Sequence, residues 1–251
     1  LGTETTHTVT ITDDDGTPNV NFSSAATNGS ESVTSVDLQV ELSNATILDV
    51  DVNFTVAAGT ATAGGTDFTL VDGQVTIPAG NTTANITVAV NDDALDEDNE
   101  TLQVTLSSVT SGNANLDTTL THTYTINDDD NAPDVEFELA TSSTTDETAT
   151  LRSFNVVLSA ASEKTITVDI TDTGTGSAVS GTDYNLTNAS PETITFNPGD
   201  TTKTVTLTPV VDTIDEGTGE TVIFNISNPL NASLGTETTH TVTITDDDGT
   251  P

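Results

Sequence analysis

The chain has 251 residues, of which 40 are Asp or Glu and only 3 are Lys or Arg, so its formal net charge at pH 7 is −37. That charge argues against nucleic acid or an anionic membrane surface as a direct partner, because both would repel the chain. The sequence has no Cys, which excludes disulfides, thiol catalysis and Cys-bound zinc, and no apolar run of about 18 residues that could span a membrane as a helix.

The first element in chain order is a repeated segment. Residues 1–18, LGTETTHTVTITDDDGTP, recur unchanged as residues 234–251, and a diverged copy, LTHTYTINDDDNAP, occupies 120–133. Alternating Thr, His, Val and Ile side chains predict a strand that ends in an Asp triplet. Such internal repeats are typical of domain arrays. We therefore predict three parts: 1–17 as the last strand and Asp triplet of a preceding repeat, 18–131 as domain 1, and 132–251 as domain 2.

Each predicted domain consists of short segments in which apolar and polar residues alternate, the period of a half-buried strand. In chain order these segments are 36–42, 50–56, 86–90 and 102–106, then 154–158, 166–170, 194–196, 205–207, 222–226 and 242–244. Residues 78–81 and 198–200, rich in Pro and Gly, predict hairpins between strands. No helical period is present, and about seven strands per domain predict an all-β fold of two tandem antiparallel immunoglobulin-like sandwiches.

Acidic residues occur at matching places in the two domains. In domain 1, six of the nine residues from Asp92 to Glu100 are acidic, and a triplet begins at Asp128. Carboxylates within about 4–6 Å of one another disfavour each other's ionisation, so consecutive Asp residues need a compensating cation. The only basic residues, Arg152, Lys164 and Lys203, all lie in domain 2. Solubilising loop acids explain a single carboxylate but not these clusters.

A bound metal ion is the remaining candidate for that cation. Oxygen ligands without Cys favour a hard cation, and Ca²⁺ accepts about 6–8 oxygens in flexible geometry. His7, His122 and His240 occupy the same position in the three repeats. They do not cluster in the sequence, so we expect ordinary strand side chains rather than zinc ligands.

Several motifs together resemble the Calx-β domain family. They are the strand endings TITDDD and TINDDD, the GTA segments followed by DF or DY, the IPAG turn, and DDALDEDNETL, and the resemblance covers both domains. It implies a seven-stranded sandwich that binds a cluster of Ca²⁺ ions in the loops at one end. The ligands it implies in domain 1 are Glu31, Asp67, Asp92, Asp93, Glu97, Glu100, Asp128, Asp129 and Asp130. In domain 2 they are Glu147, Asp183, Asp212, Glu216, Glu220, Asp246, Asp247 and Asp248.

Domain 2 departs from the family pattern at two places. Thr213 replaces the second Asp of the pair in domain 1, and Glu216 and Glu220 are spaced differently from Glu97 and Glu100. We therefore expect fewer or weaker ions in domain 2. Weaker metal candidates in the whole chain are Asp13, Asp14, Asp15, Asp96 and Asp215.

Three functions remain open at this stage, none of them enzymatic, because no catalytic constellation is recognisable. The first is a calcium-rigidified extender of a secreted or cell-surface bacterial adhesin, with neighbouring repeats of the same chain as its partners and an extracellular location. The second is a calcium-sensing regulatory module, and the third is a receptor- or glycan-binding domain. The sequence leaves open whether residues 1–12 fray, lie against domain 1, or pair with another molecule as an added strand.

Overall fold

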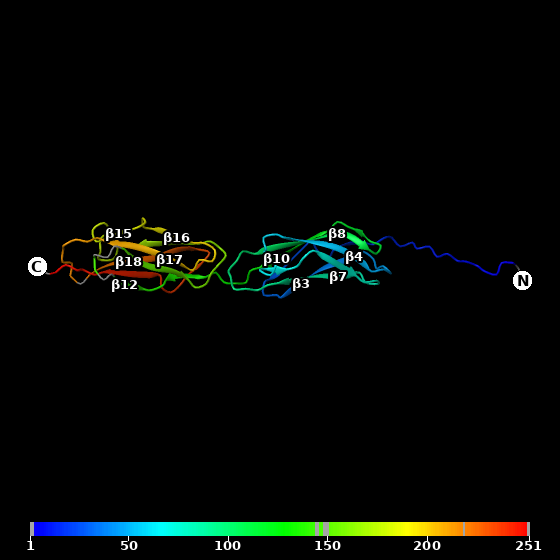
Figure 1. Ribbon diagram of the computed structural model, residues 1–251, viewed down its shortest axis with the longest axis horizontal. Coiled ribbons are helices and arrows are strands. Elements are labelled where there is room, and N and C mark those ends of the chain that lie inside the picture. Colours follow the sequence, from blue (N-terminus) through cyan, green and yellow to red (C-terminus); the bar gives the residue numbers. More distant parts are fainter. Residues whose placement is uncertain (1–2, 144–145, 148–150, 218, 250–251) are drawn as a thin grey trace. The chain divides into compact units, whose positions relative to one another are not determined.

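A computed structural model describes residues 3–143, 146–147, 151–217 and 219–249. Within these ranges the chain contains strands but no helix, and therefore no helix that could cross a membrane. It divides into two compact units (Figure 1). Unit 1 comprises Leu1–Asp93 and Asn99–Asn127, and unit 2 comprises Ala94–Asp98 and Asp128–Pro251.

The strands of unit 1 form sandwich 1, which has two five-stranded sheets with the orders β5-β7-β3-β1-β9 and β2-β10-β8-β4-β6. The strands are β1 (Asn19–Phe22), β2 (Ala26–Ser30), β3 (Ser35–Leu42), β4 (Val50–Ala58), β5 (Phe68–Thr69), β6 (Gly73–Ile77), β7 (Thr83–Val90), β8 (Glu100–Ser111), β9 (Asn115–Leu116) and β10 (Thr121–Asn127).

Sandwich 2, in unit 2, repeats this topology with the sheet orders β15-β17-β13-β11-β19 and β12-β20-β18-β14-β16. Its strands are β11 (Asp134–Phe137), β12 (Thr141–Ser143), β13 (Arg152–Leu158), β14 (Ile166–Asp172), β15 (Tyr184–Leu186), β16 (Glu192–Phe196), β17 (Thr202–Pro209), β18 (Glu220–Leu230), β19 (Ser233–Leu234) and β20 (Thr239–Ile244). The prediction of two tandem immunoglobulin-like sandwiches is confirmed. The exact domain boundaries stay a prediction.

The first and last chain segments of each sandwich take part in both sheets. In sandwich 1 the chain leaves β1 in one sheet and continues as β2 in the other, and β9 and β10 divide in the same way. The two halves pair with each other in parallel, β1 with β9 and β2 with β10. Sandwich 1 therefore consists of seven chain segments. Two of them count as two strands each, β1 with β2 and β9 with β10, and the short β5 brings the total to ten strands.

Each sandwich closes over its own apolar core. Alternation delivers this core directly: Leu102, Val104 and Leu106 on β8 are buried, and the residues between them are not. Full burial of such a side chain contributes roughly 1.5–3 kcal/mol. All seven Phe and both Tyr residues are also buried in these two cores.

Two buried histidines hold the crossing segments in place. His122 Nδ1 lies 2.7 Å from the Ser24 carbonyl oxygen, between β1 and β2, and its Nε2 lies 2.8 Å from Thr27 Oγ1. His240 makes the matching contact with Ser142 Oγ at 2.8 Å, and burial lowers the pKa of its imidazole. Both therefore serve as strand side chains that bind the neighbouring strand.

The predicted hairpins at residues 78–81 and 198–200 are wrong. In sandwich 1, β6 pairs with β4, whereas the following strand, β7, pairs with β3 and β5 in the other sheet. The same holds for β16 and β17. Pro and Gly reverse the chain direction, but they do not determine which sheet the next strand joins.

Candidate metal centres

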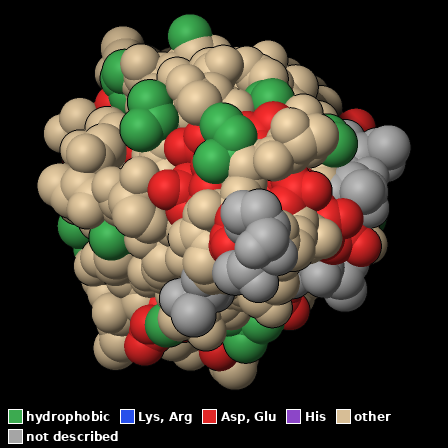
Figure 2. Space-filling view, turned by 90° about the vertical axis from the view of Figure 1, so that its left-hand side faces the viewer, with side chains coloured by type: hydrophobic (Ala, Val, Ile, Leu, Met, Phe, Trp, Pro, Cys, Tyr) green, Lys and Arg blue, Asp and Glu red, His purple; other side chains and the backbone are tan. Residues whose placement is uncertain are grey.

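The predicted ligands of domain 2 lie where strands begin or end. Asp183 directly precedes β15, Asp212 follows β17, Glu220 is the first residue of β18, and residues 246–248 follow β20. Glu147 lies between β12 and β13. Figure 2 shows Asp and Glu side chains gathered at the end of unit 2 that carries these loops. Residues far apart in the sequence therefore meet because the topology brings their strand ends together.

Six acids of unit 2 form two close groups. Each residue offers one carboxylate oxygen, and the oxygens within a group all lie within 4.8 Å of one another. Oxygens bound to one Ca²⁺ at about 2.4 Å cannot be more than about 4.8 Å apart, so this spacing is what a shared ion requires. The groups are Glu147, Asp212 and Asp248, and Asp183, Glu216 and Glu220.

Burial of these carboxylates in their charged form is unfavourable in free energy unless a cation lies nearby. Glu147 is only 3% exposed and Asp183 only 7%. Three buried carboxylate oxygens, Glu147 Oε2, Glu220 Oε2 and Asp248 Oδ2, have no hydrogen-bond partner among the described residues. A buried charged group without a partner carries a large desolvation cost. The observation therefore points to a ligand that is itself positively charged.

The electrostatics of the metal-free cluster lead to the same conclusion. Burial raises the pKa of Glu147 to about 7, with further contributions from a hydrogen bond to Glu216 and from that residue's negative charge. Burial also raises the pKa of Glu220 to about 7, assisted by Asp183 in the same way. Near neutral pH these carboxyls hold protons that a cation would displace on binding.

Asp246 shapes the loop rather than joining either group. Its Oδ2 accepts hydrogen bonds from the backbone N–H groups of Glu216 at 3.1 Å and Gly217 at 3.0 Å, and its Oδ1 accepts one from Asp248 at 3.0 Å. These bonds, that from Asp248 first, lower the pKa of Asp246. The first Asp of the triplet thus positions Glu216 and Asp248, one from each group.

A second loop is positioned in both sandwiches by the acid at its end. Asp183 Oδ2 accepts a hydrogen bond from the Val179 backbone N–H at 2.6 Å, and Asp67 Oδ2 accepts one from Thr62 at 2.5 Å. These bonds close the glycine-rich loops ahead of β15 and β5.

The predicted ligands of domain 1 are divided between the two units. Glu31, Asp67, Asp92, Asp93 and Glu100 lie in unit 1, whereas Glu97, Asp128, Asp129 and Asp130 lie in unit 2. Glu31, Asp67 and Glu97 are buried. Coordination of an ion by these residues stays a prediction.

Every member of the two groups in unit 2 was among the residues predicted from the sequence. Other predicted residues lie outside these two groups: Asp246, Asp247 and the weaker candidates Asp13, Asp14, Asp15, Asp96 and Asp215. Coordination of an ion by any of these residues stays a prediction.

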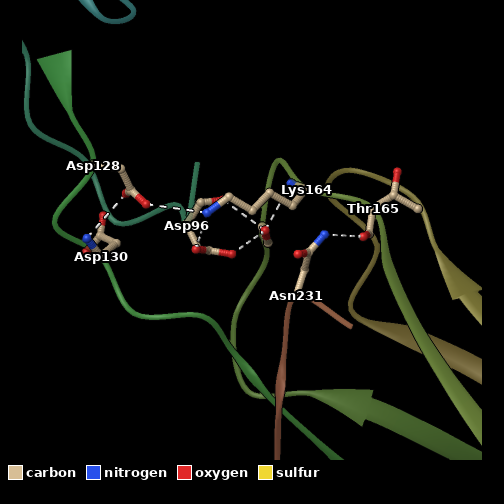
Figure 3. Close-up of polar contacts among 7 residues, drawn as sticks. Asp96, Asp128, Asp130, Lys164, Thr165 and Asn231 are labelled. Atoms are coloured by element: carbon tan, nitrogen blue, oxygen red, sulfur yellow. Dashed lines mark hydrogen bonds and ion pairs between the residues drawn. The ribbon is translucent and has the colours of Figure 1, made fainter. Parts of the chain in front are cut away.

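Asp96 is paired with a lysine side chain. It belongs to the segment Ala94–Asp98 of unit 2. Lys164 Nζ lies 2.7 Å from Asp96 Oδ1, and Ser162 Oγ donates a hydrogen bond to Asp96 Oδ2 at 2.9 Å (Figure 3). The Lys164 ammonium also lies 3.6 Å from Asp128 Oδ2. Burial alone would lower the pKa of Lys164, but Asp96 outweighs it and leaves the pKa raised. The only sign of this pairing in the sequence is the scarcity of basic residues.

Comparison with known proteins finds a matching family and similar solved structures. A family model described as "Calx-beta domain" matches residues 13–130 and 128–248. Similar solved structures include CBD12 from CALX1.2, with 19% identity, 90% of this chain and 99% of that chain covered, and a TM-score of 0.43. The apo-form Calx CBD1 domain has 23% identity, covers 46% of this chain and 100% of its own, and has a TM-score of 0.42. No curated protein matches the chain.

Proposed function

The chain belongs to the Calx-beta domain family, and on this premise we propose that its two domains are calcium-binding structural repeats that extend and stiffen a secreted or cell-surface bacterial adhesin. The observation that carries the proposal is the pair of carboxylate groups in unit 2 whose oxygens lie within 4.8 Å of one another, in a chain with only 3 basic residues. Members of this family are regulatory or structural, which is compatible with a non-enzymatic role.

The donor set fits calcium better than other common metals. All group members are Asp or Glu, and no His belongs to any group within the described residues. Carboxylate oxygens suit Ca²⁺, whereas zinc and copper favour imidazole and thiolate. Bound calcium would supply the positive charge that the buried oxygens of Glu147, Glu220 and Asp248 lack.

The stiffening part of the proposal follows from chain connectivity. The triplet 128–130 is followed by only Asn131, Ala132 and Pro133 before β11 begins at Asp134. If the triplet holds an ion, the chain is restrained immediately before it enters the next sandwich. Without the ion, repulsion among adjacent carboxylates favours a looser linker. Extracellular calcium would keep even modest sites filled.

Calorimetric titration and small-angle X-ray scattering test this proposal. We expect more than one Ca²⁺ per sandwich, and a larger maximum dimension in calcium than in EDTA. Asp128→Asn should reduce both effects, whereas the matched variant Asp117→Asn, at an exposed acid outside the groups, should not. No heat of calcium binding, or an unchanged dimension and melting temperature, would contradict the proposal.

The same titration separates the alternatives. A submicromolar Kd with a large local rearrangement would favour a calcium-sensing regulatory module instead. A receptor- or glycan-binding role has less support, because all Phe and Tyr side chains are buried and Trp is absent, so no aromatic platform lies on the surface.

A further inference from the structure

Sandwich 1 has an open groove between β6, at the edge of one sheet, and β7, in the other sheet. Its volume is about 540 Å³, which lies within the roughly 300–1,000 Å³ typical of ligand sites. Phe54, Val75 and Ile86 contribute apolar surface to the lining, and Asn85 and Thr87 contribute polar groups. None of the described lining residues is charged, although the chain has 40 acids. The groove therefore suits an occupant that is itself uncharged.

One edge of β7 borders this groove and is only partly paired. β3 pairs with the other edge along nearly its whole length, whereas β5 pairs with β7 only through Phe68 with Val90 and Thr69 with Ala89. Within the described part of the chain, no strand pairs with the rest of this edge. A strand edge with unpaired backbone N–H and C=O groups is a template for an added strand.

The alternation of the ladder identifies which backbone groups face the open edge. The Leu42 N–H donates to the Thr82 carbonyl oxygen, so even-numbered residues of β7 direct their backbone groups toward β3. The N–H and C=O groups of Thr83, Asn85 and Thr87 therefore point to the open edge. A strand added there would continue the line of β5 and pair antiparallel with β7, as β5 does.

In sandwich 2 a segment of the chain itself covers the corresponding edge. Residues 187–191 connect β15 to β16, whereas only residues 70–72 connect β5 to β6. Leu186 of β15 adds a third pair with β17, and the hydroxyl oxygens of Thr187 and Thr206 lie 2.8 Å apart. The longer connection therefore continues along β17 past the point at which the chain leaves β7 in sandwich 1.

The space left beside this longer connection is small. The cavity lined by Ile170, Val205 and residues 188–190 has a volume of only about 10 Å³. Ile170 and Val205 hold the strand positions that Phe54 and Ile86 hold in the groove of sandwich 1. Residues 188–190 thus fill in sandwich 2 the place that is open in sandwich 1.

We propose that the groove of sandwich 1 binds an extended, uncharged peptide segment of a partner protein, which adds to the open edge of β7 as a strand. Residues 186–190 of sandwich 2, Leu-Thr-Asn-Ala-Ser, indicate the chemistry of this segment: one aliphatic side chain followed by short side chains without charge. Main-chain hydrogen bonds supply affinity in strand addition, and pockets for side chains supply specificity. The proposal goes beyond the calcium function and does not depend on it.

Fluorescence anisotropy with the full-length chain and a labelled peptide of residues 184–191, YNLTNASP, tests the proposal. We expect saturable binding in calcium and in EDTA alike, and none for the peptide that carries Leu186→Asp. In the chain, Asn85→Pro should weaken binding roughly tenfold, because it removes one main-chain donor and places a ring in the path of the added strand. The Asn85 N–H points away from β3, so this variant keeps the hydrogen bonds between β7 and β3.

Two control variants isolate the backbone contact. Asn85→Ala removes the side chain but keeps the N–H, and Thr204→Pro makes the matching change on β17 in sandwich 2. Both should bind the peptide as tightly as the unsubstituted chain. Absence of peptide binding, or equal affinities for Asn85→Pro and Asn85→Ala, would overturn the proposal. Self-association of the chain that Asn85→Pro abolishes would identify a second copy as the occupant and would overturn it as well.

Amide hydrogen exchange gives a readout that does not require the proline variant to fold. Saturating peptide should slow exchange at Thr83, Asn85 and Thr87 in the unsubstituted chain, because their N–H groups become donors to the added strand. Exchange at Thr204, the matching position of sandwich 2, should not change. Unchanged exchange at the three β7 amides would show that the peptide does not add to β7 and would contradict the proposal.

Discussion

Sandwich 1 and sandwich 2 share one topology but close their cores differently at the last strand. β10 carries Tyr124 where β20 carries Val242, and sandwich 1 accommodates the larger ring because Gly29 leaves space beside its hydroxyl. The histidine two positions earlier, His122 or His240, is buried in both. The comparison shows that the buried histidine at the crossing between sheets is retained, whereas the core residue two positions after it differs.

The two sandwiches also differ in the acidic residues of corresponding loops. Sandwich 1 has the adjacent pair Asp92 and Asp93 after β7, whereas sandwich 2 has Asp212 and Thr213 after β17. The spacing of Glu97 and Glu100 also differs from that of Glu216 and Glu220. These two differences in sequence underlie the prediction of fewer or weaker ions in domain 2.

Calcium should produce the largest difference between the sandwiches. At a thousandfold excess over Kd, a single ion stabilises the folded state by about 4 kcal/mol, so the sandwich with more or tighter sites should gain more. Each sandwich has one Tyr, so Tyr184→Phe and Tyr124→Phe allow tyrosine fluorescence to report on each separately. We expect sandwich 1 to gain more, and Thr213→Asp to narrow the gap. If calcium stabilises the two sandwiches equally in these Tyr variants before Thr213→Asp is added, the expected difference between the sandwiches is wrong.

Gly29→Ala should destabilise sandwich 1 alone. The added Cβ would lie 2.4 Å from the Tyr124 hydroxyl oxygen in a filled core. Such overpacking typically costs about 1–3 kcal/mol. Chemical denaturation should show the loss in the first sandwich and none in the second. Tyr124→Phe, which removes the hydroxyl, should rescue the variant, and without that rescue the packing explanation would be wrong.

The pH dependence of the metal-free chain should distinguish sandwich 2. The pKa values of Glu147 and Glu220 are raised from 4.5 to about 7 in the folded state, so the folded state binds more protons than the unfolded state between these values. The contribution of these two carboxyls to the free energy of unfolding should therefore be complete below about pH 4.5 and be lost as pH rises through about 7. Calorimetry in EDTA should show a lower melting temperature for sandwich 2 at pH 8 than at pH 5.

One variant and one change of conditions test the assignment of that pH effect. Glu147→Gln should flatten the decline, because it removes one of the raised carboxyls and the charge beside Glu216. Saturating calcium should reverse the trend, because metal binding requires deprotonated ligands. A decline that survives both changes would have to originate elsewhere in the chain.

The smallest effect should come from the exposed ion pair in sandwich 2. Lys203 lies 2.7 Å from Asp200, but both side chains are substantially exposed. Such pairs contribute roughly 0–1 kcal/mol, so Lys203→Ala should change the free energy of unfolding by less than about 1 kcal/mol.

Lys164→Ala should lower the free energy of unfolding by more than Lys203→Ala does, because it leaves Asp96 buried without its cation. Similar costs in urea denaturation would show that Asp96 gains nothing from Lys164.

Much of the fold and all of the grouped acids of unit 2 could be predicted from the sequence. Alternation of Leu102, Val104 and Leu106 specifies a half-buried strand, because period two places them on one face. Asp183, Asp212 and Glu220 lie beside the ends of strands, and the sequence has acids at matching places in both domains. The pairing of β6 with β4, however, depends on contacts between distant strands, and a turn sequence contains no information about them.

The Asp96–Lys164 pair shows the same limitation in the site. The charge count identified Lys164 as rare, but a count does not show which of 40 acids a cation contacts. The buried position of Asp96 depends on Ser162 and Lys164, which are 66 and 68 residues distant in sequence. Local pattern predicts residue type and strand phase, whereas such pairings require the three-dimensional arrangement.

The parallel pairing of the first and last segments also determines how a sandwich responds to pulling. Since β2 and β10 run in the same direction over Ala26–Ser30, the chain enters at one end of this pair and leaves at the other. Tension along the chain therefore acts as shear along the ladder, and its hydrogen bonds share the load instead of opening one after another. Sandwich 2 has the same parallel arrangement in β12 and β20, where the described residues pair over Thr141–Ser143. Both sandwiches should therefore resist such tension in shear.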